Sequence, residues 1–355
     1  MNVLLLGGTG AMGAHLTSIL AGWVGVNLYV TSRRERLSSN NVHYVVGNAL
    51  NPDFLKDLLS RRKWDVIVDF MAYYKTEEFQ QRASLLLSST DQYIFLSSAR
   101  VYADSAEPIK EDSPRLLDVC EDKTYLATDE YALAKARQEN ILFNGSKKNW
   151  TIIRPYITFS EIRIQLAGAE KESWLYGALK GKPIFFSRDL ADKFTTLTYG
   201  YDVAKGIAAI IGKKEAFGEA FHITSQDSYK WMDILENYLN TIEYITGNRP
   251  QVIWTERWSP VVGGGAMQIK WDRLYNRCFD NTKISKYIDL NTFKETIPTL
   301  SNCVSSFINK PEFGQIDWMT EARRDKVTGT WTNINEINGA RWRIKYYLVR
   351  LGLHN

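Results

Sequence analysis

Near its N-terminus the chain reads Val3-Leu4-Leu5-Leu6-Gly7-Gly8-Thr9-Gly10-Ala11-Met12-Gly13, and residues 11–21 then carry helical periodicity. A short apolar run of this kind predicts a buried strand. Glycines between a strand and a helix let backbone amides approach a pyrophosphate at the helix N-terminus. A glycine-rich turn without a ligand is the alternative, but strand, glycines and helix agree here. We therefore expect dinucleotide contacts from Gly7, Thr9, Gly10, Ala11, Met12 and Gly13.

Further apolar runs alternate with helical stretches through the first half of the chain. The expected strands are residues 3–6, 27–31, 42–46, 65–70, 93–97 and 151–154. The expected helices between them are residues 11–21, 52–61, 76–88 and 130–143. Strands separated by helices pair in parallel through crossovers. The sequence thus predicts an α/β fold with a Rossmann-like, doubly wound parallel sheet.

The second half is less regular. A helix at 202–211 and a strand at 220–224 are expected to return to the sheet, while turn-rich, aromatic-rich segments suit a smaller lobe. The expected dinucleotide-binding domain spans residues 1–155, with returning segments near 191–225. A discontinuous C-terminal substrate lobe is expected at 156–190 and 226–310, followed by an extension at 311–355. The basic amphipathic segment 341–351 fits a helix docked on the protein better than one lying on an anionic membrane.

Composition excludes several classes of function. The chain has 355 residues, 45% of them hydrophobic, which is enough for a full hydrophobic core. Its net charge of +4 is too small to indicate nucleic-acid binding. Three separated cysteines and four histidines without ligand spacing predict no metal site. No signal peptide or membrane-spanning run is visible, and isolated cysteines suit a reducing compartment. We expect a cytoplasmic protein.

The second expected strand ends at Ser32-Arg33-Arg34. An enzyme that favours NAD usually has a carboxylate there to bind the ribose 2′-hydroxyl, and this chain has none. Guanidinium groups match the charge and geometry of a 2′-phosphate. A solvated basic turn is the alternative, but the residues favour NADP, with NAD as the second choice.

A tyrosine and a lysine, Tyr131 and Lys135, are four positions apart on an expected helix and so share one face. Free tyrosine has a pKa near 10, so its use in proton transfer at neutral pH needs a stabilised phenolate. The ammonium of Lys135 supplies that bias. Ser98 follows an expected strand and would hydrogen-bond the reacting carbonyl or alcohol.

These features together resemble the extended short-chain dehydrogenase/reductases, the group of nucleotide-sugar epimerases, dehydratases and ketoreductases. Besides the glycine turn, the resemblance rests on residues 65–72 and 97–102, Tyr131 with Lys135, and residues 153–155, 201–204 and 218–223. It implies that Ser98, Tyr131 and Lys135 are catalytic, that Phe70, Met71 and Ala72 flank the cofactor, and that Pro155 lies by the nicotinamide. Helices on this sheet often pair in the family, so a homodimer is compatible with the resemblance.

The chain also departs from the family pattern. Asn48, followed by Ala49, stands where the family often has an aspartate that contacts adenine, and an amide can make that contact. Ala99 and Arg100 occupy the place of the acidic pair of 4,6-dehydratases, which disfavours dehydration. Tyr156-Ile157-Thr158 lacks the asparagine that many members use near the sugar.

The catalytic trio does not separate the remaining reactions. The basic turn favours a keto-sugar reductase that uses NADPH, and an epimerase with tightly held NAD(P) is the alternative. A non-catalytic module that senses the dinucleotide or binds RNA or protein is a third interpretation, although it would not need the trio. The substrate is expected to be a nucleotide sugar, contacted by Tyr102, Lys193, Lys270 and Arg273.

Overall fold

The computed structural model describes residues 1–39 and 41–353. It divides into two compact units, each assembled from separate parts of the chain. The first unit contains residues 1–160, 196–227 and 278–296, and the second contains residues 161–195, 228–277 and 297–355. The chain therefore passes back into the first unit at 278–296, a segment that the sequence analysis assigned to the substrate lobe. Residues 311–353 are part of the second unit, and residues 354–355 of the expected extension lie outside the described residues.

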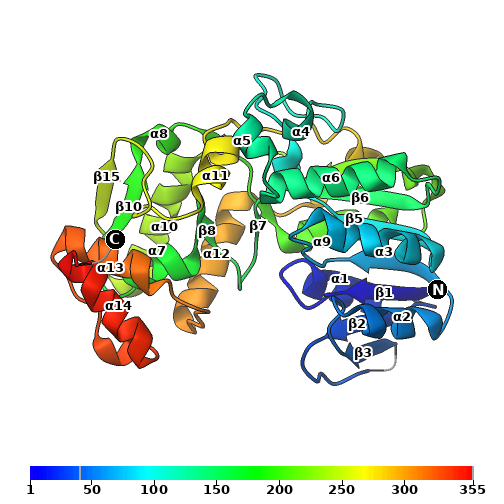
Figure 1. Ribbon diagram of the computed structural model, residues 1–355, viewed down its shortest axis with the longest axis horizontal. Coiled ribbons are helices and arrows are strands. Elements are labelled where there is room, and N and C mark those ends of the chain that lie inside the picture. The colour runs from blue at the N-terminus through cyan, green and yellow to red at the C-terminus, as the bar shows by residue number, and fades with distance from the viewer. Residues whose placement is uncertain (40, 354–355) are drawn as a thin grey trace. The chain divides into compact units, whose positions relative to one another are not determined.

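Within the described residues, the first unit is built on a seven-stranded sheet in the order β13-β6-β5-β4-β1-β2-β3 (Figure 1). Every neighbouring pair is parallel. The strands are β1 (Asn2–Leu6), β2 (Asn27–Ser32), β3 (Val42–Val46), β4 (Trp64–Asp69), β5 (Thr90–Leu96), β6 (Trp150–Pro155) and β13 (Glu219–Ile223). The predicted doubly wound sheet is confirmed, and the run at 220–224 does return to it beside β6.

Alternate strand residues point to opposite faces of the sheet. Both faces are apolar here, and helices cover both. Val3 and Leu5 pack in one apolar cluster with α1 (Gly13–Ala21) and α9 (Gly200–Ile210). Leu4 and Leu6 pack in another, with α2 (Pro52–Ser60), α3 (Thr76–Ser88) and α6 (Tyr131–Asn144). The order of the strands reverses between β1 and β4, and in such sheets ligands bind at the carboxyl ends of the strands at this switch point.

Short elements complete the first unit. They are η1 (Ala99–Val101), α4 (Leu116–Val119), α5 (Lys123–Leu126), β7 (Thr158–Phe159), β12 (Thr198–Tyr199), η2 (Lys214–Ala216), η4 (Ile284–Lys286) and η5 (Leu290–Thr292). The returning segment is held by an isolated bridge between Ile109 and Phe279 and by the His222 ring, whose Nε2 lies 2.6 Å from the Asp280 carbonyl oxygen. Such long-range pairing is invisible in local sequence periodicity.

The second unit is mainly helical, with short paired strands. Its helices are α7 (Lys171–Ala178), α8 (Arg188–Ala191), α10 (Trp231–Thr246), α11 (Ala266–Gln268), the π-helical η3 (Ile269–Arg273), α12 (Thr296–Asn309), α13 (Trp318–Thr328), η6 (Ile334–Glu336) and α14 (Ala340–Leu351). Its strands are β8 (Gln165–Leu166), β9 (Ala169–Glu170), β10 (Ile184–Ser187), β11 (Phe194–Thr195), β14 (Tyr229–Lys230) and β15 (Val252–Thr255). None of the described helices is both long and apolar enough to span a bilayer.

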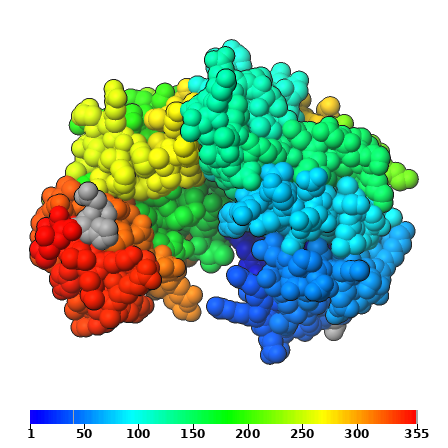
Figure 2. All heavy atoms as spheres, in the orientation of Figure 1, coloured from blue at the N-terminus to red at the C-terminus, as the bar shows by residue number. Residues whose placement is uncertain are grey.

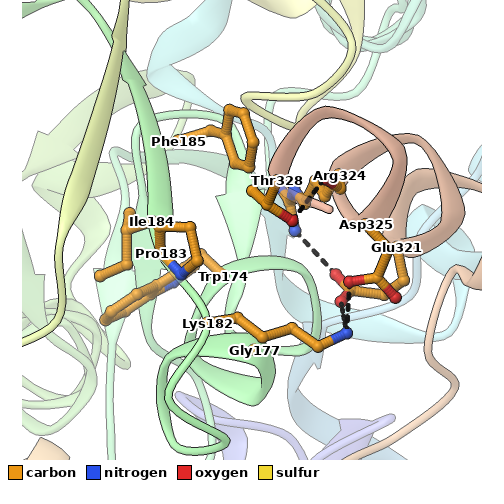
Figure 3. Close-up of a pocket in the computed structure, with 10 residues that line it drawn as sticks. All are labelled: Trp174, Gly177, Lys182, Pro183, Ile184, Phe185, Glu321, Arg324, Asp325 and Thr328. Atoms are coloured by element: carbon orange, nitrogen blue, oxygen red, sulfur yellow. Dashed lines mark hydrogen bonds and ion pairs between the residues drawn. The ribbon is translucent and has the colours of Figure 1, made fainter. Parts of the chain in front are cut away.

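A buried carboxylate holds the C-terminal helices of this unit together. Asp325 on α13 accepts hydrogen bonds from Lys182 Nζ at 2.6 Å, Thr332 Oγ1 at 2.8 Å and the Tyr346 hydroxyl of α14 at 2.6 Å. Figure 3 shows Lys182 reaching from the segment before β10 toward Asp325 and Glu321. In Figure 2 the residues of α13 and α14, orange to red, form one continuous surface patch. The basic C-terminal helix thus has internal packing partners.

Candidate active site

The glycine turn after β1 has the backbone conformation that its sequence requires. Gly7 has φ +72°, and a Cβ there would lie 2.7 Å from the Met71 sulfur. A Cβ on Gly13 would lie 2.6 Å from the Gly8 Cα, so α1 begins in direct contact with the turn. Gly10 is different, because a Cβ there would meet no described atom within 4 Å. The turn is closed toward the protein and open at Gly10.

The N-terminus of α1 is suited to an anionic group. Its first turn contains no acidic residue, and no side chain caps it among the described residues. Unpaired N–H groups and the helix dipole favour negative charge at such an end. The open position at Gly10 and the helix start at Gly13 therefore fit the pyrophosphate of a dinucleotide. Thr9, just before Gly10, and Ala11 and Met12, between Gly10 and Gly13, are partly exposed.

The predicted NADP turn follows β2. Ser32 is buried, and its hydroxyl donates to the Arg34 carbonyl at 2.8 Å, so this side chain already orders the turn. Arg33 and Arg34 are exposed. Asn48 is exposed as well, although its side-chain oxygen accepts from the Leu50 amide at 3.1 Å. The structure therefore leaves both guanidinium groups in solvent.

The residues predicted to flank the cofactor lie at the ends of strands. Phe70 and Met71 follow β4 and are half-buried, and Ala72 is exposed. Ala49, in the turn between β3 and α2, is buried. The Phe70 amide donates to the Leu6 carbonyl at 2.9 Å, which joins this segment to the start of the glycine turn. Pro155 is the last residue of β6.

The predicted catalytic trio gathers around the carboxyl end of β5. Ser98 follows this strand, and its Oγ accepts the Arg100 amide at 3.2 Å as the cap of η1. Tyr131 is the first residue of α6, whose N-cap Glu130 accepts the Ala132 amide at 2.8 Å. The Arg100 guanidinium carbon lies 5.3 Å from the centre of the Tyr131 ring. Sequence reasoning gave Arg100 no role beyond weakening the case for dehydration.

Lys135 is buried, with 2% of its surface exposed. Its ammonium donates to the Leu96 carbonyl at 2.7 Å and lies 4.6 Å from the centre of the Phe95 ring. Burial lowers the pKa of this lysine from 10.5 to about 8, while the negative charges of Asp69 and Glu139 oppose that shift. At neutral pH the ammonium is therefore still mostly protonated, but the pH is close to its pKa.

Two buried carboxylates near Lys135 were missed by the sequence analysis. Asp69 ends β4, and burial raises its pKa. Glu139 lies one turn beyond Lys135 on α6, where the Ser97 hydroxyl donates to it at 2.6 Å and Arg154 donates through two nitrogens at 2.8 Å. The spacing of Tyr131, Lys135 and Glu139 at four-residue intervals was the available signal.

The predicted substrate contacts are less favourably placed. Tyr102 is fully buried, and its hydroxyl accepts a hydrogen bond from Arg154 at 2.9 Å. Arg273 is also buried, pairs with Asp272, and donates from Nε to the Ala167 carbonyl at 3.0 Å. Both side chains therefore bind partners within the protein, and residue type alone does not predict such burial.

The two predicted lysine contacts remain at least partly accessible in the second unit. Lys193 is half-buried beyond α8. Lys270 is exposed, with its ammonium 4.3 Å from the Trp271 ring centre. Their roles stay predictions.

Comparison with known proteins identifies the family. The profile described as the NAD dependent epimerase/dehydratase family matches residues 3–224, which is more than half of the chain. This chain belongs to that family. The matched region contains the glycine turn, the predicted catalytic trio and the last strand of the sheet. The family member described here is thus an enzyme of the extended short-chain dehydrogenase/reductase type, with a nicotinamide dinucleotide as its cofactor.

Solved structures of other proteins show the same fold. UDP-glucuronic acid 4-epimerase from Bacillus cereus, in complex with NAD, aligns with a TM-score of 0.65 and 16% identity over 90% of this chain and 99% of that one. dTDP-glucose 4,6-dehydratase from Bacillus anthracis, also with NAD, gives 0.65 and 16% over 88% and 98%. An epimerase from Methanothermobacter thermautotrophicus gives 0.63 and 19% over 87% and 92%. No curated protein matches the sequence.

Proposed function

We propose that this family member is an NADP(H)-dependent oxidoreductase that acts on a nucleotide-linked sugar as a keto-sugar reductase. The observation that supports this most is the placement of Lys135. Its buried ammonium lies at the end of β5, one helical turn from Tyr131, in the unit that carries the glycine turn. The nucleotide-sugar part rests on the family and on the substrates named for similar structures, such as UDP-glucuronic acid.

Each residue of the trio has a separate task in this proposal. The bound cofactor supplies the hydride. Tyr131 donates the proton to the oxygen of the reduced carbon, and the charge of Lys135 makes that phenol more acidic. Ser98 uses an acceptor position for the Arg100 amide, so its own O–H proton can be donated to the substrate oxygen. The half-buried position of Tyr131 keeps the hydroxyl-bearing residue within reach of a ligand.

The choice of NADP rests on Arg33 and Arg34. Both are exposed after β2, where a 2′-phosphate would be recognised, and guanidinium groups bind phosphate by charge and by paired hydrogen bonds. Replacing both with serine should weaken NADPH binding by about tenfold or more and leave NADH binding nearly unchanged. Calorimetric titration measures both constants. Equal affinity of the unaltered protein for the two cofactors would refute the assignment.

Epimerisation is the second candidate. Two of the similar structures described above are epimerases, and the one from B. cereus was solved with NAD. In an epimerase the same residues would remove the hydroxyl proton of a sugar alcohol while bound NAD(P) would accept the hydride from its carbon, and both would be returned after the keto form has presented its opposite face. The non-catalytic interpretation is less well supported, because this enzyme family member retains Ser98, Tyr131 and Lys135.

Anaerobic incubation with nucleotide sugars and their 4-keto forms tests these alternatives. Loss of NADPH absorbance with formation of a reduced sugar supports the reductase, and isomer formation without net consumption supports the epimerase. Replacing Tyr131 with phenylalanine should leave cofactor binding intact and lower turnover by about 100-fold or more. Unchanged turnover in that variant would refute Tyr131 as proton donor.

A further inference from the structure

Asp69 has an unusual environment for the last residue of a strand. Its side chain accepts hydrogen bonds from the Tyr93 hydroxyl at 2.7 Å, the Tyr73 hydroxyl at 2.8 Å and the Met71 amide at 2.9 Å. It is completely buried. Burial of a carboxylate is costly unless hydrogen bonds or charges compensate. Burial raises the pKa of Asp69, the three neutral donors oppose that shift by favouring its charged form, and no arginine pairs with it among the described residues.

The register of the sheet brings this carboxylate toward Lys135. Asp69 and Phe95 are opposite each other on β4 and β5, and the Lys135 ammonium lies 4.6 Å from the Phe95 ring centre. Tyr93, two residues before Phe95, points to the same face of the sheet and donates to Asp69. Helix α6, which carries Lys135, packs on this face. Asp69 and the lysine therefore share one buried layer.

Glu139 is a weaker counter-charge for the lysine than Asp69. Its two oxygens already accept from Arg154 at 2.8 Å and from Arg115 at 3.2 Å. Two cations thus neutralise Glu139, whereas the partners of Asp69 are neutral. Of these two carboxylates, Asp69 is therefore the one whose charge is not already neutralised by arginines.

The remaining titratable groups around the pair do not replace Asp69. Burial and the nearby Asp69 charge raise the pKa of Tyr73 and of Tyr93 well above 10, so both stay neutral near physiological pH. Arg82 on α3 contacts the Tyr73 ring at 5.5 Å and donates to the Ala49 carbonyl at 3.1 Å. Tyr131 is the group whose acidity the charge of Lys135 is proposed to increase.

We propose that Asp69 is a positioning residue that keeps Lys135 charged for proton transfer at Tyr131. The role in proton transfer rests on the proposed function, but the charge coupling between Asp69 and Lys135 does not. Without Asp69 the buried ammonium would lose its counter-charge and give up its proton more readily. Tyr131 would then be a weaker acid in the working pH range, although no residue that touches the substrate had changed.

Titration of the full chain labelled with 13C at lysine Cε tests the coupling without any substrate. Comparison with Lys135→Arg identifies the signal of Lys135. In Asp69→Asn the midpoint of this titration should fall by about one pH unit or more, as expected when an opposite charge is removed. The matched control is Asp65→Asn on the same strand, where the carboxylate accepts the Asn2 amide at 2.6 Å, and there the midpoint should not move.

An unchanged Lys135 midpoint in a folded Asp69→Asn protein would overturn the proposal. If that variant does not fold, Asp69→Ser provides the same neutral comparison with a smaller side chain. Once a substrate is known, the alkaline limb of the kcat pH profile should shift in the same direction and by the same amount as the Lys135 midpoint. A midpoint shift in a protein without reductase or epimerase activity would support the coupling and refute the proposed function.

Discussion

Replacement of Lys135 with methionine should make the first unit more stable near neutral pH. Burial lowers the pKa of Lys135 from 10.5 to about 8. At about 1.4 kcal/mol per pH unit, this difference means that the charged lysine costs the folded state about 3 kcal/mol. Methionine removes the charge and also the hydrogen bond to the Leu96 carbonyl, which contributes about 1 kcal/mol. We therefore expect a net gain of about 2 kcal/mol at pH 7.

The sign of the pH dependence follows from proton binding. Between pH 8 and 10.5 the unfolded chain keeps the lysine proton and the folded protein has lost it, so stability rises with pH in this window. The advantage of Lys135→Met over the unaltered protein should be full below pH 8 and should disappear toward pH 10.5.

Urea unfolding of the cofactor-free protein, measured at several pH values, gives the required free energies. Lys56→Met is the control, because Lys56 is exposed on α2 and its replacement should give no such pH-dependent difference. If Lys135→Met is less stable than the unaltered protein at pH 7, or if the difference is independent of pH, the electrostatic cost of the buried lysine has been misjudged.

Two further predictions concern the glycine turn and the buried carboxylate of the second unit. Gly10→Ala should leave the melting temperature unchanged and weaken dinucleotide binding. Gly13→Ala should lower the melting temperature and also weaken binding, because its Cβ would lie 2.6 Å from the Gly8 backbone. Thermal melts and cofactor titrations separate the two effects, and a normal melting temperature for Gly13→Ala would contradict the packing argument. Asp325→Asn should lower the free energy of unfolding by about 3 kcal/mol, because the largely buried Lys182 loses the nearer of its two carboxylate partners. Denaturant titration measures this loss, and replacement of the exposed Glu312 with glutamine is the control. Equal losses in the two variants would refute the stabilising role of Asp325.

Much of the sheet was predictable from the sequence. Each of its strands is a short apolar run bounded by polar or turn residues, and the strand boundaries differ from the predicted ones by a few residues at most. The two-residue strands β7 and β12 were not predicted, since pairing over so few residues depends on contacts far away in the chain. The same reason explains the unexpected return of residues 278–296 to the first unit.

The arrangement of the candidate site was predictable where it follows from the spacing of residues along a helix. Tyr131 and Lys135 are related by one helical turn, which the sequence shows directly. Asp69 was missed, because a single aspartate at the end of a strand does not indicate which hydroxyl groups will surround it. Tyr102 and Arg273 were predicted as substrate contacts from residue type, yet buried partners occupy both. Tertiary packing decides whether a polar group is buried, and the local sequence pattern does not predict it.

The interleaving of the two units along the chain has a consequence for synthesis on the ribosome. Domains that are continuous in sequence can fold one after another as they emerge. Here the first unit lacks its last segment until residue 296 has been made, and by then large parts of the second unit have already been synthesised. Tyr346, which binds Asp325, comes later still. Neither unit can therefore be completed before most of the chain has been made.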